Sequence, residues 1–359
     1  MLRVLAVTNV YPTVQAPGVG TFIEQQVKGL EASGVEVDLL FIDRPRQGMS
    51  AYLHVGGQVR RRLAMFRPHV VHAMYGGIMA DEVGRAVRDT PLVVSFCGED
   101  LLGEPLSAYL EAGKPVAGCL RKIIAGYGVW ASYRAARRAH RIVVKSKNLQ
   151  EALPRDVDPT KVHIIPNGVD LERFRPMDQR EARRRLGWPA ETLVVLFVTA
   201  AGVPRKRLGL AEAAVASIPT GDRPVEFRIM SGVPHAQVPL WLNAADVLLL
   251  TSFHEGGVNI VKEAMACNLP IVSVDVGDVR ERLDGVRACA VAEATPTALG
   301  ETLRCTLQQR ERSDGRNHLQ VLTLTAVAER LKEVYTQALY AVAAPLGYTP
   351  ATSRPTASR

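Results

Sequence analysis

The stretch of residues 246–278 constrains the fold of this 359-residue chain more than any other stretch. Its pattern of apolar, glycine and helix-stopping residues predicts four consecutive elements: a strand at Val247–Leu250, a loop at Ser252–Gly257, a helix at Val258–Cys267 and a strand at Ile271–Val274. Two strands joined through a helix are parallel, because a parallel pair needs a long crossover connection. The chain is therefore expected to build a parallel sheet covered by helices.

The loop between this strand and this helix is the expected ligand site, because open α/β sheets bind ligands beyond the carboxyl ends of their strands. Gly256 and Gly257 let backbone N–H groups approach a ligand, and the N-terminus of the following helix suits phosphate. Glu255 lies in the loop and Glu263 lies in the helix, with seven residues between them. Carboxylates repel phosphate, so the pair suits sugar hydroxyls. A plain surface loop with two solvated glutamates is the alternative.

The composition, with 47% hydrophobic residues, is that of a globular protein, and the length suits two α/β domains. No apolar run reaches the roughly 18 residues of a membrane helix. The N-terminus resembles a first strand more than an export signal, so a cytoplasmic location is expected. The cysteines are odd in number and lack C-x-x-C spacing, which favours reduced thiols and disfavours zinc.

The net charge of +8 suits phosphorylated substrates or an anionic membrane as partners. Nucleic acid is disfavoured, because no basic stripe with interleaved aromatic residues is present. Weak peripheral association with the inner face of a membrane is therefore a secondary hypothesis.

The N-terminal residues repeat the plan of strand, loop, helix and strand. Strands are predicted at Leu2–Val7 and Val35–Ile42, with a helix at Thr21–Ser33 between them. The loop after the first strand contains Gly18 and Gly20 but lacks the pattern G-x-G-x-x-G, so a nicotinamide cofactor is disfavoured. A flexible surface loop is the alternative to a loop that lines a ligand site.

A cluster of cations follows the strand predicted at Leu193–Thr199. Arg205, Lys206 and Arg207 lie where the loop after this strand passes into a helix that begins near Leu208. Arginine can donate to two oxygens at once and lysine acts as a point charge, so the cluster suits a diphosphate. A solvated run of charged residues is the alternative.

Two segments carry a resemblance to a known family. The first is Glu255-(seven residues)-Glu263, followed by Leu-Pro-Ile-Val and Val-Gly-Asp, and the second is VHIIPNGVDLERFRP at residues 162–176. Both resemble the retaining glycosyltransferases of the GT-B fold, family 4. The resemblance extends over nearly the whole chain to about residue 340 and is strongest at these two segments.

This resemblance implies an α/β fold with two Rossmann-like parallel-sheet domains that face each other across a cleft. Residues 1–175 would form the acceptor-side domain and residues 176–345 the donor domain. The last helix, at about 323–342, would cross back onto the first domain. Residues 346–359 are rich in Ser, Thr, Pro and Arg and are expected to be disordered.

The implied activity is transfer of a hexosyl group from a UDP- or GDP-sugar to an acceptor hydroxyl, with retention at the anomeric carbon. The acceptor would be a glycan, a lipid-linked molecule or a small molecule, in glycan, glycolipid or exopolysaccharide biosynthesis. No Asp-x-Asp motif with divalent-metal logic stands out, so neither a metal nor another cofactor is expected.

The resemblance also implies roles for single residues. Glu263 would hold the donor ribose, Glu255 would orient the donor sugar, and Lys206 with Arg205 would neutralise the leaving diphosphate. Further donor-side candidates are Gly18, Gly20, Gly232, His235, Gly256, Gly257, Val258 and Asn259. Acceptor-side candidates are His72, Tyr75, Asp100 and Asn167, and a purely structural role is the alternative for His72.

The chain departs from the family pattern at two positions. Cys97, itself a catalytic candidate, stands where the family usually has a histidine, and cysteine cannot reproduce that hydrogen bonding. The family's upstream arginine falls near Ala200 and is absent. Two alternatives therefore stay open: a nucleotide-sugar-binding GT-B protein with lost or altered activity, or another GT-B enzyme such as a sugar-nucleotide epimerase.

Overall fold

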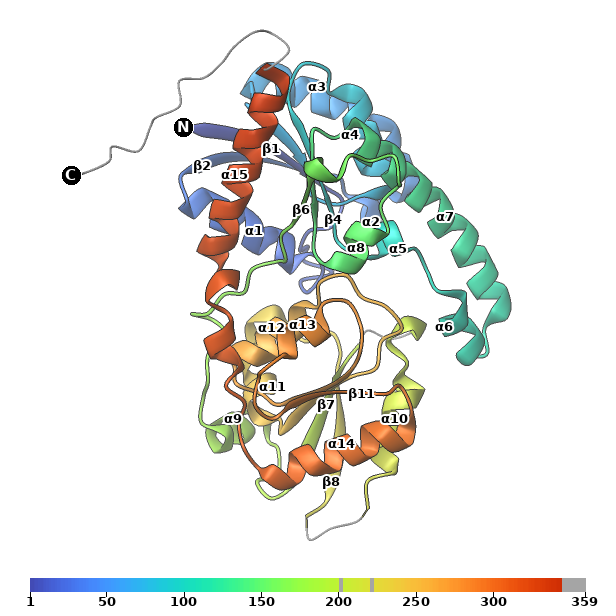
Figure 1. Cartoon of the computed structure of the whole chain (residues 1–359), viewed down its shortest axis with the longest axis vertical. Helices are drawn as coiled ribbons and strands as arrows, with labels where there is room; N and C mark the ends of the chain where they lie inside the picture. Colours follow the sequence, from blue (N-terminus) through green and yellow to red (C-terminus); the bar gives the residue numbers. More distant parts are fainter. Residues whose placement is uncertain (200–202, 220–222, 344–359) are drawn as a thin grey trace, which may run out of the picture.

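Two parallel β-sheets, each flanked by helices, form the two halves of an elongated molecule (Figure 1). The computed structural model describes residues 1–199, 203–219 and 223–343. Ala200 and the tail predicted at 346–359 lie outside these described residues. Within them, no helix combines the length and the apolar character that crossing a bilayer requires.

The sheet of the first domain has the strand order β2-β1-β3-β4-β5-β6, and every pair of neighbouring strands in it is parallel. Its central strands are mostly apolar and are buried along their whole length, as expected for a parallel sheet with both faces covered. The strands are β1 (Leu2–Thr8), β2 (Val35–Phe41), β3 (Val70–Ala73), β4 (Leu92–Phe96), β5 (Arg141–Val144) and β6 (Val162–Ile164).

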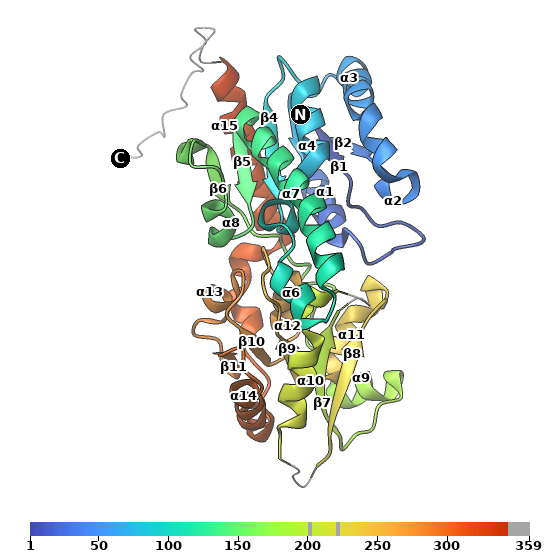
Figure 2. The same ribbon diagram turned by 90° about the vertical axis from the view of Figure 1, so that its right-hand side faces the viewer.

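Helices connect these strands and cover the sheet (Figure 2). The longest of them, α7 (Pro115–Arg138), packs its C-terminal part on α4 and α5, and its N-terminal part follows the short helix α6. The helices are α1 (Thr21–Ala32), α2 (Arg44–Gln47), α3 (Val55–Phe66), α4 (Gly77–Ala86), α5 (Glu99–Leu102), α6 (Leu106–Glu111), α7 and α8 (Lys147–Glu151), with 3-10 helices η1 (Gly48–His54) and η2 (Pro159–Lys161).

The sheet of the second domain is also parallel, in the order β11-β10-β9-β7-β8. Its strands are β7 (Leu193–Val198), β8 (Val225–Met230), β9 (Val247–Leu250), β10 (Ile271–Val274) and β11 (Cys289–Ala292). Its helices are α9 (Gln179–Leu186), α10 (Leu208–Ala216), α11 (Val238–Ala244), α12 (Asn259–Ala266), α13 (Val279–Leu283) and α14 (Pro296–Gln309), with η3 (Pro204–Lys206), η4 (His235–Gln237), η5 (Gly315–His318) and η6 (Gln320–Leu322).

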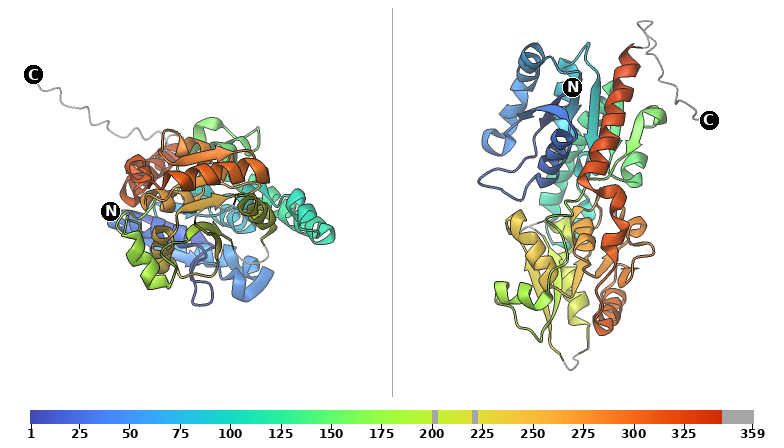
Figure 3. Two further views of the ribbon diagram at one scale, coloured as in Figure 1. Left: turned by 90° about the horizontal axis from the view of Figure 1, so that it is seen from below. Right: turned by 90° about the vertical axis from the view of Figure 1, so that its left-hand side faces the viewer.

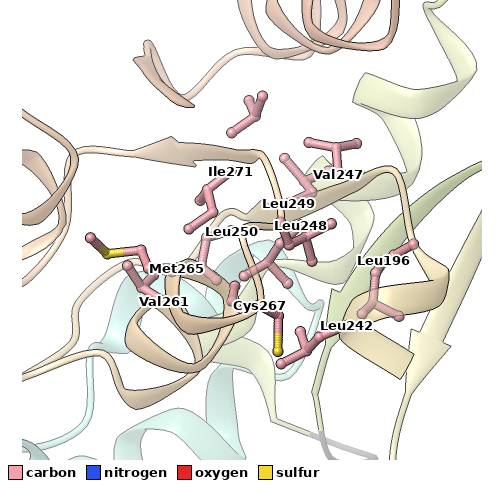
Figure 4. Close-up of a cluster of buried hydrophobic side chains, with 14 of the residues drawn as sticks. Leu196, Leu242, Val247, Leu248, Leu249, Leu250, Val261, Met265, Cys267 and Ile271 are labelled. Atoms are coloured by element: carbon pink, nitrogen blue, oxygen red, sulfur yellow. The ribbon is translucent and has the colours of Figure 1, made fainter. Parts of the chain in front are cut away.

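The core of the second domain is built around strand β9 (Figure 4). Residues Val247–Leu250 are all buried between the helices, with Leu196 and Ile271 on the neighbouring strands. Val261 and Met265 of α12 lie four residues apart on one helix face and join the same core. The βαβ unit predicted at residues 246–278 is therefore confirmed, and it fixes the position of the loop between β9 and α12.

The last helix, α15 (Leu324–Ala343), leaves the second domain and returns to the first (Figure 3). It packs along α1, and its buried side chains Val327, Leu331, Val334 and Tyr335 belong to the core under the first sheet. The predicted architecture of two Rossmann-like domains with a helix that crosses back is confirmed. The boundary at residue 175 falls between the last strand of the first sheet and the first strand of the second, and it stays a prediction.

His72 is fully buried on β3 and fastens α15 to the first sheet. Its Nδ1 lies 2.8 Å from the Tyr335 hydroxyl and its Nε2 lies 2.7 Å from the Ser95 hydroxyl. Burial, helped by the Lys145 ammonium, lowers the pKa of His72 to about 3, so the ring stays neutral. The prediction that His72 lies on the acceptor side is wrong, because both ring nitrogens are used inside the core.

Replacing Tyr335 with phenylalanine is expected to destabilise the protein by about 1–3 kcal/mol, because His72 then loses a partner in a buried site. The melting temperature reports the change. Tyr340→Phe is the matched control, since Tyr340 lies on the same helix with 49% of its surface exposed. Equal melting temperatures for Tyr335→Phe and the wild type would contradict the assignment.

Candidate active site

A cleft of about 870 Å³ lies between the two domains, lined by loops from both sheets. Most of the candidate residues from the sequence are brought together there. The cleft is lined by Gly18, Gly20, Tyr75, Cys97, Asn167, Arg205, Lys206, Gly232, His235, Glu255, Gly256, Gly257, Val258, Asn259 and Glu263, among others.

The loop between β1 and α1 forms one wall of the cleft and contains Gly18 and Gly20. Gly20 adopts the left-handed conformation, with φ of 76°, at the start of α1. A Cβ at Gly20 would lie 2.6 Å from the backbone nitrogen of Tyr11, so a side chain does not fit there. This glycine allows the loop to fold back tightly before the helix begins.

Glu255 is the centre of a compact ion-pair cluster on the second-domain side of the cleft. Its Oε1 lies 2.5 Å from Lys206 Nζ and 2.9 Å from a terminal nitrogen of Arg205. Burial alone would raise the pKa of the Glu255 carboxyl, but the Lys206 ammonium and the Arg205 guanidinium outweigh it and hold that pKa below its ordinary value. Glu255 is therefore ionised at neutral pH, and the two cations point into the cleft beside it.

Glu99 of the first domain also binds this cluster, and the sequence did not single it out as a site residue. Arg205 Nε donates to Glu99 Oε1 at 2.5 Å across the cleft. Arg207 makes a similar bridge to Glu111, with nitrogen–oxygen distances of 3.1 and 3.2 Å. The sequence did contain a sign of this role, because Glu99 lies near Cys97 in the loop that follows a strand. Either Glu99 or the adjacent Asp100 could face the cleft from that loop.

Glu263 is held by a chain of side chains that starts near the link between the domains. A terminal nitrogen of Arg173 lies 2.9 Å from His235 Nδ1, and His235 Nε2 lies 3.1 Å from Glu263 Oε1. Because arginine can only donate, Nδ1 is the acceptor and the ring proton is on Nε2, which donates to the carboxylate. His235 therefore fixes the orientation of Glu263 in addition to lining the cleft.

The loop between β9 and α12 fits closely against the first domain. Asn148 Nδ2 donates to the Glu255 carbonyl at 2.9 Å, and Asn167 Nδ2 donates to Asn259 Oδ1 at 3.1 Å. A Cβ at Gly256 would lie 2.1 Å from the carbonyl oxygen of Cys97. Glycine at this position therefore lets the two domains approach until their backbones touch.

Gly256→Ala is expected to push the domains apart, which should destabilise the protein by about 1–3 kcal/mol. Melting curves measure the effect. Gly209→Ala is the matched control, because a Cβ there meets nothing within 4 Å. A Gly256→Ala protein with the stability of the wild type would show that the domains are not in backbone contact in solution.

Cys97 lines the cleft at the point of domain contact. It is the position where the family that the sequence resembles usually has histidine. Burial raises the pKa of its thiol to about 12, the Lys145 ammonium opposes this rise, and the Asp100 carboxylate adds to it. The thiol therefore stays protonated at neutral pH, and its Sγ points toward the Met74 carbonyl at 3.7 Å. Cys97 offers the site a weak donor and no thiolate nucleophile.

Asp100 is a structural anchor of the same loop. Its carboxylate accepts hydrogen bonds from the backbone N–H groups of Gly76 at 2.9 Å, Cys97 at 3.0 Å and Gly98 at 2.7 Å. Burial raises its pKa above the ordinary value, although these donors act in the opposite direction. The prediction that Asp100 lies on the acceptor side is wrong, because its oxygens are occupied by the backbone of the loop.

The start of α12 has one of its N–H groups already bound. The Val258 N–H donates to Asp278 Oδ1 at 3.1 Å, so this group is not open to a ligand.

In the described part of the chain, no three His, Cys, Asp or Glu side chains are grouped so that they could hold a metal ion. The expectation that no metal is needed stays a prediction.

Comparisons with known proteins match both domains to glycosyltransferases. The family model described as Glycosyltransferase Family 4 matches residues 17–173, and the one described as Glycosyl transferases group 1 matches residues 194–309. The chain is 25% identical to TuaC of Bacillus subtilis, named as a glycosyltransferase of teichuronic acid biosynthesis, over 84% of this chain and 88% of that protein. It is 28% identical to a GDP-mannose-dependent alpha-mannosyltransferase of Mycobacterium tuberculosis, over 74% of this chain and 78% of that protein.

A solved structure supports the same fold. HepE of Anabaena, in complex with UDP and glucose, superimposes with a TM-score of 0.65 at 15% identity, over 94% of this chain and all of that chain. Six further relatives, all D-inositol 3-phosphate glycosyltransferases, are matched over only 40–53% of their own length. The two family models together extend over most of the chain and include strands of both sheets. The chain therefore belongs to the family 4, or group 1, glycosyltransferases.

Proposed function

We propose that this protein is a retaining glycosyltransferase that transfers a hexosyl group from a UDP- or GDP-sugar to an acceptor hydroxyl in the biosynthesis of a glycan, glycolipid or exopolysaccharide. One observation carries the proposal. The cleft places a cation cluster, Arg205 and Lys206, and a held carboxylate, Glu263, around one space of about 870 Å³. A nucleotide sugar needs this combination of groups, because it contains both a diphosphate and sugar hydroxyls.

The names of similar proteins agree with such a donor. HepE was solved with UDP and with UDP-glucose, and the mycobacterial relative is named for dependence on GDP-mannose. These two relatives use different nucleobases, so the base that this chain prefers is a matter for experiment. TuaC is named for teichuronic acid biosynthesis, which supports an acceptor that is itself a carbohydrate or carries one.

In the proposed mechanism, catalysis rests on positioning and charge. Lys206 and Arg205 turn from Glu255 and Glu99 toward the diphosphate and stabilise the negative charge that grows as the sugar leaves. Glu255 accepts hydrogen bonds from hydroxyls of the donor sugar. Glu263 accepts from the ribose hydroxyls, and His235 keeps its carboxylate in place. Because two cations already serve the diphosphate, we expect turnover without an added metal.

The test is release of nucleoside diphosphate from a panel of UDP- and GDP-sugars, with the purified wild-type chain and a heat-inactivated control. The proposal expects one nucleotide series to be cleaved above the control, with and without a chelator. Proton NMR of the first sugar released should show the anomer of the donor, which indicates retention. Release of the opposite anomer would contradict the retaining mechanism, and cleavage of none of the donors would contradict the proposed activity.

A protein that binds nucleotide sugars without turnover is the second candidate, and the state of Cys97 favours it. A protonated, half-buried thiol stands at the domain contact in place of the histidine that is usual in the family. Cys97→His separates the candidates when it is assayed beside the wild type. Activity in the wild type excludes the binding-only function, and activity in Cys97→His alone supports it.

A further inference from the structure

We propose that one exposed face of helix α7 docks on an anionic phospholipid bilayer. The α7 face is defined by its exposed apolar side chains Val116, Ile123, Ile124, Tyr127 and Trp130. Helix α7 is 24 residues long and projects from the body of the molecule, as the view from below shows most clearly (Figure 3, left). Its outer part is therefore free to meet a flat surface.

The apolar content of the α7 face is unusual for a surface helix. Val116 and Ile123 expose 82% and 73% of their surface, and the other three side chains are about half exposed or more. Ile123, Tyr127 and Trp130 follow each other at intervals of four and three residues, so they lie on one side of the helix. Contiguous apolar side chains on a protein surface mark a binding surface for a membrane or another molecule.

The charge of the same segment selects an anionic partner. Residues 112–138 contain six Lys or Arg residues and no Asp or Glu. Arginines near the C-terminal end of α7 pair with carboxylates. Arg138, for example, lies 2.5 Å from Asp81. Lys114, Arg121 and Lys122 are exposed and make no salt bridge within the described residues, although the Arg121 guanidinium is close enough to Glu104 to oppose the rise of that carboxyl's pKa. Their charges are therefore available to lipid phosphates, each contributing roughly 1 kcal/mol near an anionic leaflet.

Two aromatic rings on the α7 face are of the kind that favours the headgroup level of a bilayer. Tyr127 and Trp130 stack with ring centroids 5.4 Å apart, and the guanidinium of Arg134 lies 4.6 Å from the Trp130 ring. Tyr and Trp favour the headgroup level of membranes, because each has an apolar body and a polar tip. The stacked pair holds both rings at the surface and does not bury them in the domain.

The α7 face lies next to the rim of the active-site cleft. Helix α6, which leads into α7, contacts η3, the segment that contains Arg205 and Lys206. Glu111 at the end of α6 pairs with Arg207 across the domains. Docking through α7 would hold this rim close to the lipid surface, where a lipid-linked acceptor is presented. The docking itself does not depend on the proposed transfer activity.

The experiment is flotation of the full-length chain with vesicles of phosphatidylglycerol and phosphatidylcholine, compared with vesicles of phosphatidylcholine alone. Two variants remove parts of the surface: Arg121→Gln with Lys122→Gln, and Ile123→Gln with Tyr127→Gln. All four side chains are exposed, so melting curves and donor binding are expected to match the wild type. Each variant should bind anionic vesicles about ten- to thirtyfold more weakly than the wild type.

Matched controls remove equal charge and equal apolar surface elsewhere. Arg184→Gln with Arg185→Gln changes the exposed face of α9, and Val321→Gln with Tyr340→Gln changes exposed apolar side chains of the second domain and α15. Both controls should bind vesicles within twofold of the wild type. Equal binding of the wild type to anionic and neutral vesicles, or wild-type binding by both α7 variants, overturns the proposal. Self-association that the Ile123→Gln, Tyr127→Gln variant abolishes would assign the face to a second copy of the chain instead.

Discussion

Replacing Lys206 with methionine is expected to lower kcat/KM for sugar transfer by about a hundredfold to a thousandfold, the usual effect of losing one charge-stabilising donor in an active site. The ammonium of Lys206 lies 2.5 Å from Glu255 Oε1, in a pocket with little solvent. Methionine keeps the length and the apolar stem of lysine but has no charge. The diphosphate would then leave with Arg205 as its partner and without the second cation.

The rate is measured as nucleoside diphosphate release from the preferred donor, with saturation curves for both substrates. Lys28→Met is the matched control, because Lys28 also pairs with a glutamate, at 2.7 Å from Glu24, but lies on the exposed side of α1. The control should keep wild-type kinetics. If Lys206→Met also keeps kcat/KM within about threefold of the wild type, Lys206 has no role in the chemical step.

Replacing Glu263 with alanine is expected to weaken donor binding by about ten- to a hundredfold, the range for a lost hydrogen bond to a charged group. Glu263 lines the cleft and is oriented by His235 at 3.1 Å, so its carboxylate is already in place when a ribose arrives. The fold should stay intact, because the side chain lies at the cleft wall and not in the core. Calorimetric titration with the donor measures the affinity.

Glu212→Ala is the control for this second prediction, since Glu212 is an exposed glutamate on α10 of the same domain. It should bind the donor like the wild type, and both variants should have the melting temperature of the wild type without ligand. A Glu263→Ala protein with unchanged donor affinity would mean that the ribose lies elsewhere.

Local sequence was sufficient for the elements that have a strong apolar pattern. The predicted bounds of β9 and β10 agree with the structure residue for residue, and α9 has the capping residues that are typical of a helix. Asp178 accepts a hydrogen bond from the Glu181 N–H at the start of α9, and Gly187 follows its end in the left-handed conformation. The sequence did not predict β11 or α14, because the four residues of β11 are only half-buried and have no clear period.

Side-chain direction explains why two site candidates were wrong. Every residue of β3 is buried, since a parallel sheet is covered on both faces, so alternation along the strand does not show which face His72 takes. Glu99 and Asp100 are adjacent acids in one loop, and only the folded backbone decides that Asp100 turns inward to three N–H groups while Glu99 reaches Arg205.

The sequence also does not show which residues that are far apart in the chain lie close together in the fold. His235 bridges Arg173 and Glu263, which lie 62 residues before it and 28 residues after it in the sequence. The sequence made His235 a donor-side candidate, and it gave no sign that the ring orients a carboxylate. Gly256 was expected to let a ligand approach, and its closest neighbour is the Cys97 carbonyl of the other domain.

The most direct test of the central claim, that the cleft between the domains binds a nucleotide sugar, is a thermal-shift panel with UDP, GDP and their sugars, without and with Mg²⁺. A ligand that binds only the folded chain stabilises it by about 2.7 kcal/mol at a hundred times its Kd. We predict a shift that is selective for one nucleobase, independent of Mg²⁺ and much reduced in Glu263→Ala. The absence of a shift with every nucleotide, or an equal shift in Glu263→Ala, would contradict the claim.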